Sequence, residues 1–315
     1  MTSSISEGLP TRQVKANHLS FCVEERGPEN GEPIVFVMGL GCQMTFWPEA
    51  LLETFAQQGY RVIRFDNRDV GLSEKVSSHI RVDTRLAFFK HKLGIRFRTA
   101  YSLHDMAQDL ACLIDALGYD NVHVVGISMG GMIAQLLAAT YPDRVRSLNL
   151  LMTSTNAPNL PPPDFKVLLR FATMKPAGHD EETAVQRWLE FWQVVSSPEH
   201  EVDLAEVEAR VRLGYQRSYC PAGTLRQMHA ILASGSLKPY SKKIKAPTLV
   251  LHGRDDPLLK PICGRAVARA IGHAHFEELA RMGHDLPAPL LPRIAAMIQH
   301  NCEIYQRLAQ VRQSA

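Results

Sequence analysis

Residues 122–135, VHVVGISMGGMIAQ, decide the fold that this sequence predicts. The apolar, β-branched run 122–127 is typical of a buried strand, and from Met132 onward the apolar residues recur with the spacing of a helix. The turn between them carries the pattern Gly-x-Ser-x-Gly at 126–130. A serine at such a turn adopts a strained backbone, and glycine on either side removes the Cβ atoms that would clash with the neighbouring chain. We therefore expect Ser128 to project as a nucleophile above one edge of a sheet.

The overall composition is that of an ordinary globular protein. The chain has 315 residues, of which 45% are hydrophobic and 21% charged, and its formal net charge of +3 is too small to indicate a nucleic-acid partner. Six cysteines occur without a CxxC pair, which predicts neither a zinc site nor a disulfide framework and is typical of a reducing compartment. The first twenty residues are polar, and no apolar run is long enough to span a membrane. We therefore expect a cytoplasmic protein with no stable membrane insertion, no metal and no cofactor; the sequence carries no signal for its oligomeric state.

Strand-like and helix-like runs alternate along most of the chain. A hairpin is predicted over 13–25, and buried strands are predicted at 33–38, 61–66, 122–127, 145–152, 246–252 and 275–279. Helical patterns separate these strands, which favours a mostly parallel sheet with helices on both faces. We assign residues 1–156 and 243–315 to this α/β core.

Between the two core segments, residues 157–242 show helical patterns only. Four helices are predicted there, at 164–174, 180–195, 204–218 and 224–233. We interpret this insertion as a helical lid, whose large apolar side chains either line a substrate pocket or simply pack the lid itself. These side chains are Phe165, Phe171, Met174, Trp188, Phe191, Trp192 and Met228. We assign Trp188, Phe191 and Trp192 to substrate binding.

A short basic segment, residues 75–101, interrupts the alternation within the core. Between 75 and 98, seven lysine and arginine residues accompany the single acid Asp83, and leucine and phenylalanine are interleaved with them. Such a segment can lie on an anionic membrane surface. We favour the simpler interpretation, a small helical insertion whose apolar side packs on the domain and whose cations are solvated.

A serine nucleophile needs a base and an acid, and two later loops can supply them. His284 lies in a Gly-His loop after the last predicted strand, and Asp256 follows the strand before it. Because each residue follows a strand and the chain order is Ser, Asp, His, all three are expected at the carboxyl edge of one sheet, where ligands bind. We therefore predict a triad of Ser128, Asp256 and His284.

Other residues of the same types are weaker candidates. His273 and His275 lie before or within the last predicted strand and are interpreted as structural. Asp255 is adjacent to Asp256, and only one of the two can point at the imidazole. We favour Asp256 and expect its neighbour to cap a helix or to stay in solvent. Asp66 comes too early in the chain for the acid and is expected to organise its own loop.

The glycine-rich turn 39–41 follows the first strand of the predicted parallel sheet and precedes a helical pattern from residue 44 to 58. The tetrahedral intermediate of acyl transfer needs two hydrogen-bond donors, one from the residue after the nucleophile and one from a turn in this position. We predict that the backbone N–H groups of Met129 and Leu40 form this oxyanion hole. The alternative is that the turn only changes the direction of the chain.

These motifs together resemble the α/β-hydrolase fold superfamily, from about residue 14 to residue 300. The resemblance rests on GISMGG at 126–131, DNRDVGLS at 66–73, HGRDDP at 252–257 and Gly-His at 283–284. The stretches VMGLG at 37–41 and FDNRD at 65–69 look most like bacterial esterases of the group that includes aclacinomycin methylesterase. The resemblance implies an ester substrate, and the triad and oxyanion roles given above.

We therefore predict a serine carboxylesterase that cleaves esters of small to medium, largely apolar substrates through an acyl-enzyme intermediate. Two alternatives remain. The Ser-Met-Gly-Gly stretch also resembles the non-haem haloperoxidases of this fold, which suggests a cofactor-free perhydrolase. A protein can also keep this fold and bind a ligand without turnover.

Overall fold

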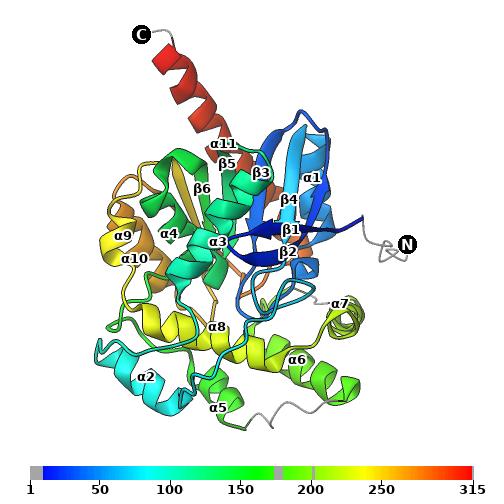
Figure 1. Ribbon diagram of the computed structural model, residues 1–315, viewed down its shortest axis with the longest axis vertical. Helices are drawn as coiled ribbons and strands as arrows, with labels where there is room; N and C mark the ends of the chain where they lie inside the picture. Colours follow the sequence, from blue (N-terminus) through cyan, green and yellow to red (C-terminus); the bar gives the residue numbers. More distant parts are fainter. Residues whose placement is uncertain (1–9, 174–179, 201–202, 314–315) are drawn as a thin grey trace.

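The computed structural model describes residues 10–173, 180–200 and 203–313, which contain one eight-stranded sheet (Figure 1). The strands lie in the order β1-β2-β4-β3-β5-β6-β7-β8. They are β1 (Arg12–Ala16), β2 (Leu19–Arg26), β3 (Glu32–Val37), β4 (Tyr60–Phe65), β5 (Val122–Ile127), β6 (Val145–Leu151), β7 (Thr248–Gly253) and β8 (His275–Leu279). The pairs β1–β2 and β2–β4 are antiparallel, and all other neighbours are parallel. The predicted hairpin and the mostly parallel sheet are therefore confirmed.

Helices enclose the sheet on both faces. Every residue of β5 and β7 is buried, as expected for strands covered on both sides. One apolar cluster joins the sheet to α3 (Leu103–Ala116), α4 (Met129–Thr140) and α10 (Pro261–Ile271). A second cluster, which uses the alternate residues of β3, joins it to α1 (Glu49–Gln57) and α11 (Leu291–Gln313). Among the helices of the described ranges, none combines the length and the apolar character that crossing a bilayer requires.

The connection from β6 to β7 is helical. In its described residues it forms α5 (Phe165–Thr173), α6 (Glu181–Val195), α7 (Leu204–Arg217), α8 (Pro221–Ser234) and α9 (Lys238–Ser241). The first four agree with the predicted helices, and α9 is a single turn that the sequence did not predict. Figure 1 shows α5 to α8 grouped at the end of the molecule opposite the C-terminus. Loops that follow the carboxyl ends of β3, β4 and β6 hydrogen-bond to this group.

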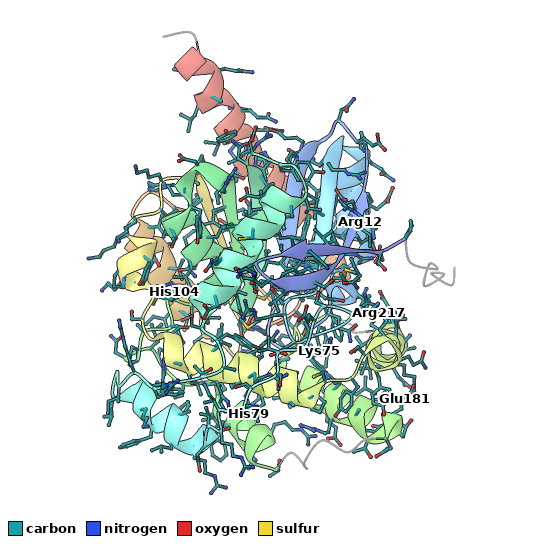
Figure 2. All side chains as sticks on the ribbon, viewed as in Figure 1. Arg12, Lys75, His79, His104, Glu181 and Arg217 are labelled. Atoms are coloured by element: carbon teal, nitrogen blue, oxygen red, sulfur yellow. The ribbon has the colours of Figure 1, made fainter. Side chains whose placement is uncertain are left out.

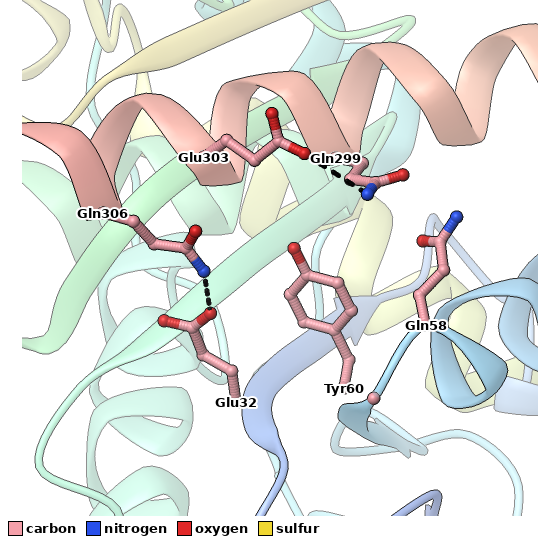
Figure 3. Close-up of a pocket in the computed structure, with 7 residues that line it drawn as sticks. Glu32, Gln58, Tyr60, Gln299, Glu303 and Gln306 are labelled. Carbon is pink, nitrogen blue, oxygen red and sulfur yellow. Dashed lines mark hydrogen bonds between the residues drawn. The ribbon is translucent and has the colours of Figure 1, made fainter.

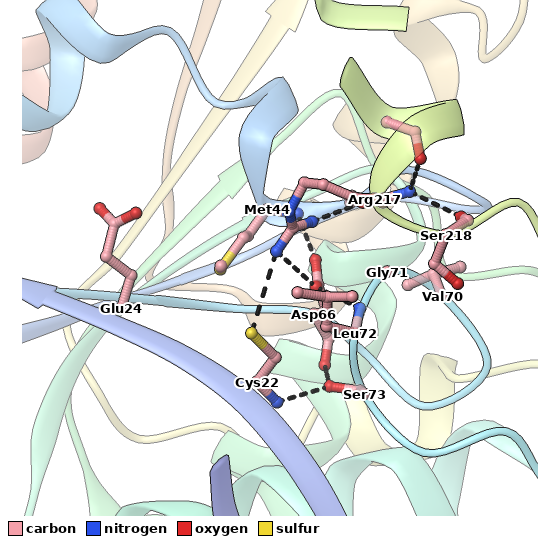
Figure 4. Close-up of polar contacts among 12 residues, drawn as sticks. Cys22, Glu24, Met44, Asp66, Val70, Gly71, Leu72, Ser73, Arg217 and Ser218 are labelled. Carbon is pink, nitrogen blue, oxygen red and sulfur yellow. Dashed lines mark hydrogen bonds and ion pairs between the residues drawn. The ribbon is translucent and has the colours of Figure 1, made fainter. Parts of the chain in front are cut away.

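Polar contacts join α7 to the loop after β4 (Figure 4). Arg217, at the end of α7, lies 3.1 Å from the buried carboxylate of Asp66. The same carboxylate accepts the backbone N–H groups of Met44 and Leu72 at 2.8 and 2.9 Å. Asp66 therefore organises its loop, as expected from the sequence, and also anchors α7.

A second arginine holds α8 in a similar way. Arg226 donates two hydrogen bonds, of 2.7 and 2.8 Å, to the buried Asp69. Lys75 lies nearby, at the junction of the sheet and these helices (Figure 2), and donates to the carbonyl oxygens of Val70 and Ser73. Removing one partner of a buried ion pair typically costs about 3–5 kcal/mol. These contacts therefore stabilise the position of α7 and α8 on the core.

The basic segment differs from the interpretation that we favoured from the sequence. Its helix is α2 (Thr84–Lys92). The apolar side chains of Leu86, Phe89 and Leu93 are exposed, whereas His91 is buried. The prediction that the apolar side packs on the domain is therefore wrong, because the helix packs through its small and polar residues instead.

A polar pocket lies at the amino ends of β3 and β4 (Figure 3). Glu32, Tyr60, Gln299 and Gln306 are among the residues that line it. Ser128 follows the carboxyl end of β5, which runs parallel to β3. The pocket therefore lies at the opposite edge of the sheet from the predicted nucleophile and is separate from it.

Candidate active site

Ser128 occupies the sharp turn between β5 and α4, with φ +54° and ψ −119°. A positive φ is rare for a residue other than glycine and costs about 1–3 kcal/mol unless the surroundings enforce it. Here the Ser128 N–H donates to the carbonyl oxygen of Leu151 at 2.9 Å, and the Thr153 hydroxyl donates to the carbonyl oxygen of Ser128 at 2.7 Å. β6 and the residues after it therefore hold the serine in its strained conformation.

The two glycines of the turn are required by close packing. A Cβ atom at Gly126 would lie 2.6 Å from the carbonyl oxygen of Gly130, and a Cβ atom at Gly130 would overlap the carbonyl oxygen of Val37. Real Cβ atoms do not approach oxygen this closely, so a side chain at either position would push α4 away from the sheet. The Gly-x-Ser-x-Gly pattern thus has a steric reason in this structure.

Asp256 and His284 meet beside this edge of the sheet. The Nδ1 atom of His284 lies 2.7 Å from Oδ2 of Asp256. The Asp256 side chain is fully buried, and its other oxygen accepts the backbone N–H groups of Leu258 and Leu259 at 2.9 and 2.8 Å. The neighbouring Asp255 is exposed and accepts the N–H of Arg281 instead. The structure therefore brings Asp256, and not Asp255, to the imidazole.

The carboxyl group of Asp256 stays ionised although it is buried. Burial alone would raise its pKa, but the attraction of His284 and hydrogen bonds from His252 and His284 outweigh burial and lower the pKa to about 2. A carboxylate on Nδ1 keeps the proton of a neutral imidazole on that nitrogen. Nε2 is then free to act as a base.

The end of α6 holds the loop that carries His284. The backbone N–H of His284 donates to the carbonyl oxygen of Val195 at 2.7 Å, and that of Gly283 donates to the Ser197 hydroxyl oxygen at 2.9 Å. Ser197 also hydrogen-bonds to the buried carboxyl group of Asp285, at 2.5 Å. Neither Ser197 nor Asp285 is predicted from the sequence, because no local pattern indicates that α6 reaches this loop.

The turn 39–41 passes directly beside the serine. A Cβ atom at Gly39 would lie 3.3 Å from Cβ of Ser128. The N–H of Gly41 donates to the side-chain oxygen of Gln227, a fully buried residue of α8, at 2.9 Å. Among the backbone hydrogen bonds in the turns, loops and caps of the described residues, none is donated by the N–H groups of Leu40 or Met129. Gln227 was also missed from the sequence, since a lone glutamine in a helix gives no sign of such a contact.

Two aromatic residues of α6 pack near the segment that follows this turn. The ring centroids of Trp188 and Trp192 lie 5.4 and 6.5 Å from that of Phe46, in the short 3-10 helix 44–46. Phe191 contacts Trp188, with its ring 6.1 Å away. All three predicted substrate-binding residues are thus part of one aromatic cluster between α6 and the core.

The other apolar residues considered for a pocket differ in their burial. Phe165 is 78% exposed, so both alternatives given for it, lining a pocket and packing within the lid, are wrong. Met228 is half-buried on α8. Met174 and the side chain of Phe171 lie outside the described residues.

Comparison with known proteins agrees with this architecture. Residues 32–287 match the model of a family described as alpha/beta hydrolase fold. Rhodomycin D methylesterase DauP of Streptomyces sp. (strain C5) is 26% identical over 312 residues, which cover 92% of this chain and 97% of that protein. A Mycobacterium tuberculosis protein named as a non-heme bromoperoxidase is 24% identical and covers 81% and 87% of the two chains. The solved enol-lactonase from Burkholderia xenovorans LB400 has a TM-score of 0.65 at 22% identity, over 92% of this chain and 97% of that one. Because the family model matches most of its length, this chain belongs to the α/β-hydrolase fold family.

Proposed function

We propose that this protein is a serine hydrolase that cleaves carboxylic esters through an acyl-enzyme intermediate. The observation that carries the proposal is the 2.7 Å contact between His284 and the buried Asp256, at the sheet edge where the strained Ser128 lies. The names of two curated relatives, rhodomycin D methylesterase and a 3-oxoadipate enol-lactonase of Acinetobacter baylyi, support an ester or lactone as the bond that is cleaved.

In the first half of the proposed reaction, Nε2 of His284 takes the hydroxyl proton of Ser128 as Oγ attacks the ester carbonyl carbon. The backbone N–H groups of Leu40 and Met129 donate to the oxyanion that forms. The imidazolium then gives the proton to the departing alkoxide. The alcohol leaves, and Ser128 remains acylated.

In the second half, water replaces the alcohol. Nε2 of His284 takes one proton from the water as its oxygen attacks the acyl carbonyl carbon. When the tetrahedral intermediate collapses, the C–O bond to Ser128 breaks and the proton returns to Oγ. The carboxylic acid leaves, and the enzyme returns to its starting state with Asp256 still ionised.

We infer that residues 157–242 act as the lid that selects the substrate. Its helices hydrogen-bond to the loops that follow β3, β6 and β8, and its aromatic cluster of Trp188, Phe191 and Trp192 packs toward the core. Pockets lined by aromatic side chains bind mostly apolar ligands. Small to medium, largely apolar esters are therefore the substrates that we expect.

A fluorophosphonate probe tests the proposed nucleophile. Folded protein is expected to react at Ser128, because only a serine activated by a neighbouring base attacks this phosphorus. Peptide mass spectrometry locates the label. The control is Ser236→Ala, which changes a serine in the loop after α8 and should leave the labelling unchanged. Absence of label on Ser128, in protein that is folded by circular dichroism, would overturn the proposal. A panel of nitrophenyl esters and methyl esters then defines the acyl and alcohol groups.

A perhydrolase is the second candidate. The relative named as a non-heme bromoperoxidase and the Ser-Met-Gly-Gly stretch favour it. In that reaction peroxide, and not water, would attack the acyl-enzyme. Faster turnover of acetate with hydrogen peroxide than of any ester in the panel would favour the perhydrolase; the opposite order supports the esterase.

The esterase activity is expected to decline as the pH falls, because the uptake of one proton by the imidazole inactivates the base. Only neutral imidazole acts as a base, and histidine ordinarily takes up its proton between about pH 8 and pH 5. Asp256 stays ionised down to about pH 2, so it does not contribute to this decline. The logarithm of kcat/KM should therefore fall with a slope of one. A flat profile down to about pH 4, or a slope of two, would contradict the role of His284 as base.

A further inference from the structure

The exposed apolar side chains of this protein are concentrated in two places. Fifteen large hydrophobic side chains are exposed in the described part of the chain, and nine of them belong to residues 80–95 or to α5. The nine include all three exposed phenylalanines, Phe88, Phe89 and Phe165. Single exposed apolar residues are normal, but a cluster of this kind marks a contact site.

The inner side of α2 is made of small and polar residues that contact α8. Oγ1 of Thr84 lies 2.9 Å from Nε2 of His229, and Nδ1 of His91 lies 3.1 Å from the carbonyl oxygen of Leu232. Ala87, one turn after Thr84, is also buried. These contacts determine which side of the helix faces the protein.

The outer side of α2 is therefore apolar. Leu86, Phe89 and Leu93 follow one another at helical spacing, and Phe89 and Leu93 are 59% and 58% exposed. A surface helix normally buries this stripe against its own domain. Here the stripe points into solvent, so it is available to bind something outside the domain.

α5 continues this surface. Phe165, Leu168 and Leu169 are exposed at the spacing of one helical stripe. Lys92, the last residue of α2, donates to the carbonyl oxygen of Leu160 at 3.1 Å, which ties the end of α2 to the chain that leads into α5. Figure 1 shows both helices at the same end of the molecule, beyond α8 as seen from the sheet.

The segment that carries α2 is strongly basic. Residues 80–98 carry six cations and one acid, a net charge of +5, in a chain whose total is +3, so the remaining residues together carry −2. Arg81, Arg85, Arg96 and Arg98 of this segment are exposed, and so is Lys166 of α5. The nearby acids are already engaged: Asp83 caps α2, Asp164 lies 2.8 Å from Lys260, and Glu190 pairs with Arg170.

We propose that residues 80–98 and 165–169 form a docking surface that binds the surface of an anionic lipid bilayer. The leucine and phenylalanine side chains would enter the boundary between headgroups and acyl chains, and the arginine and lysine side chains would contact anionic headgroups. An apolar protein partner would leave the cations unpaired, and a nucleic acid would leave the apolar stripe exposed. An anionic bilayer can bind both the cations and the apolar stripe. Docking brings the helices around the candidate active site to the place where apolar esters dissolve.

Sedimentation with sucrose-loaded vesicles tests this inference without any turnover. The intact protein, and its Ser128→Ala variant equally, should bind vesicles of phosphatidylcholine mixed with phosphatidylglycerol. Binding to phosphatidylcholine alone should be at least about tenfold weaker, and added salt should weaken the binding to anionic vesicles. Because the experiment measures binding, and the Ser128→Ala variant lacks the nucleophile that would attack the lipid esters, its result is independent of the proposed esterase activity.

Two sets of substitutions separate charge from apolar contact. Arg81→Gln, Arg85→Gln and Arg96→Gln together should lower the partition coefficient about 100-fold, since each cation near an anionic surface contributes about fivefold, or about 1 kcal/mol. Phe89→Gln with Leu93→Gln should lower it by about tenfold or more. The matched controls change equal numbers of exposed residues elsewhere. They are Lys242→Gln, Lys245→Gln and Arg269→Gln for charge, and Leu204→Gln with Leu308→Gln for apolar contact.

Three outcomes would overturn the inference: no binding of the intact protein to anionic vesicles at low salt, equal binding by the docking-surface variants, or equal losses in the control variants. Self-association that the Phe89 and Leu93 substitutions abolish, without vesicle binding, would assign the surface to a second copy of the chain instead. All variants should keep their thermal unfolding temperature and their hydrolysis of a water-soluble ester, which excludes a folding defect.

Discussion

Replacement of Ser128 by alanine is expected to lower kcat for ester hydrolysis by about 10⁴-fold to 10⁶-fold, because the residual rate comes only from substrate binding and the oxyanion donors. His284→Ala should lower kcat to a similar extent. The double variant should be no slower than either single variant, since a nucleophile and its base act as one unit. Single-turnover kinetics with a nitrophenyl ester measure all three.

A matched control for this experiment is available in the chain. His275 is an exposed histidine of β8 that lies near Glu277 and has no part in the proposed triad. His275→Ala should leave kcat unchanged within about twofold, as expected for a surface substitution. Additive losses for Ser128→Ala and His284→Ala, or a strong loss for His275→Ala, would contradict the proposed assignment.

The two neighbouring aspartates are expected to differ by orders of magnitude. In Asp256→Asn, the amide oxygen can still accept the N–H groups of Leu258 and Leu259, but its NH₂ group would face Nδ1 of His284. The imidazole would then place its proton on Nε2, the wrong nitrogen for a base, and kcat should fall by about 10²-fold to 10⁴-fold.

Asp255→Asn is the control for this substitution. Its carboxylate is exposed and accepts one backbone N–H, from Arg281, so an amide oxygen can replace it. We expect a change in kcat of about twofold at most. Thermal unfolding distinguishes lost catalysis from lost folding, because Asp256 is buried. Equal losses for the two variants would show that the contact between His284 and Asp256 is structural.

Local patterns were sufficient for most of the fold. Continuous apolar runs predicted the buried strands, because strands that are covered on both faces have no polar side. The elbow was recognisable because only glycine fits on both sides of Ser128, where Val37 and Gly130 approach the backbone. The helices between β6 and β7 were predicted in number and position from their spacing and capping residues, except for the single turn of α9.

The orientation of α2 is a feature that local sequence patterns did not predict. The sequence predicted a helix with an apolar stripe, and the natural expectation was that this stripe packs inward. It faces outward because α8 offers His229 and the Leu232 carbonyl oxygen to the polar side of the helix. Those partners come from about 140 residues later in the chain, and no periodicity within α2 indicates them.

The sequence by itself determined the class of the fold and the chain order of Ser128, Asp256 and His284, because strands, turns and their glycines depend on neighbouring residues. Only the tertiary structure decided which aspartate meets the imidazole, how Gln227 and Ser197 hold the two loops beside the serine, and which side of α2 faces solvent. These features arise from contacts between distant segments. Their geometry is set by the packing of α6 and α8 on the sheet, which the pattern of any single segment does not contain.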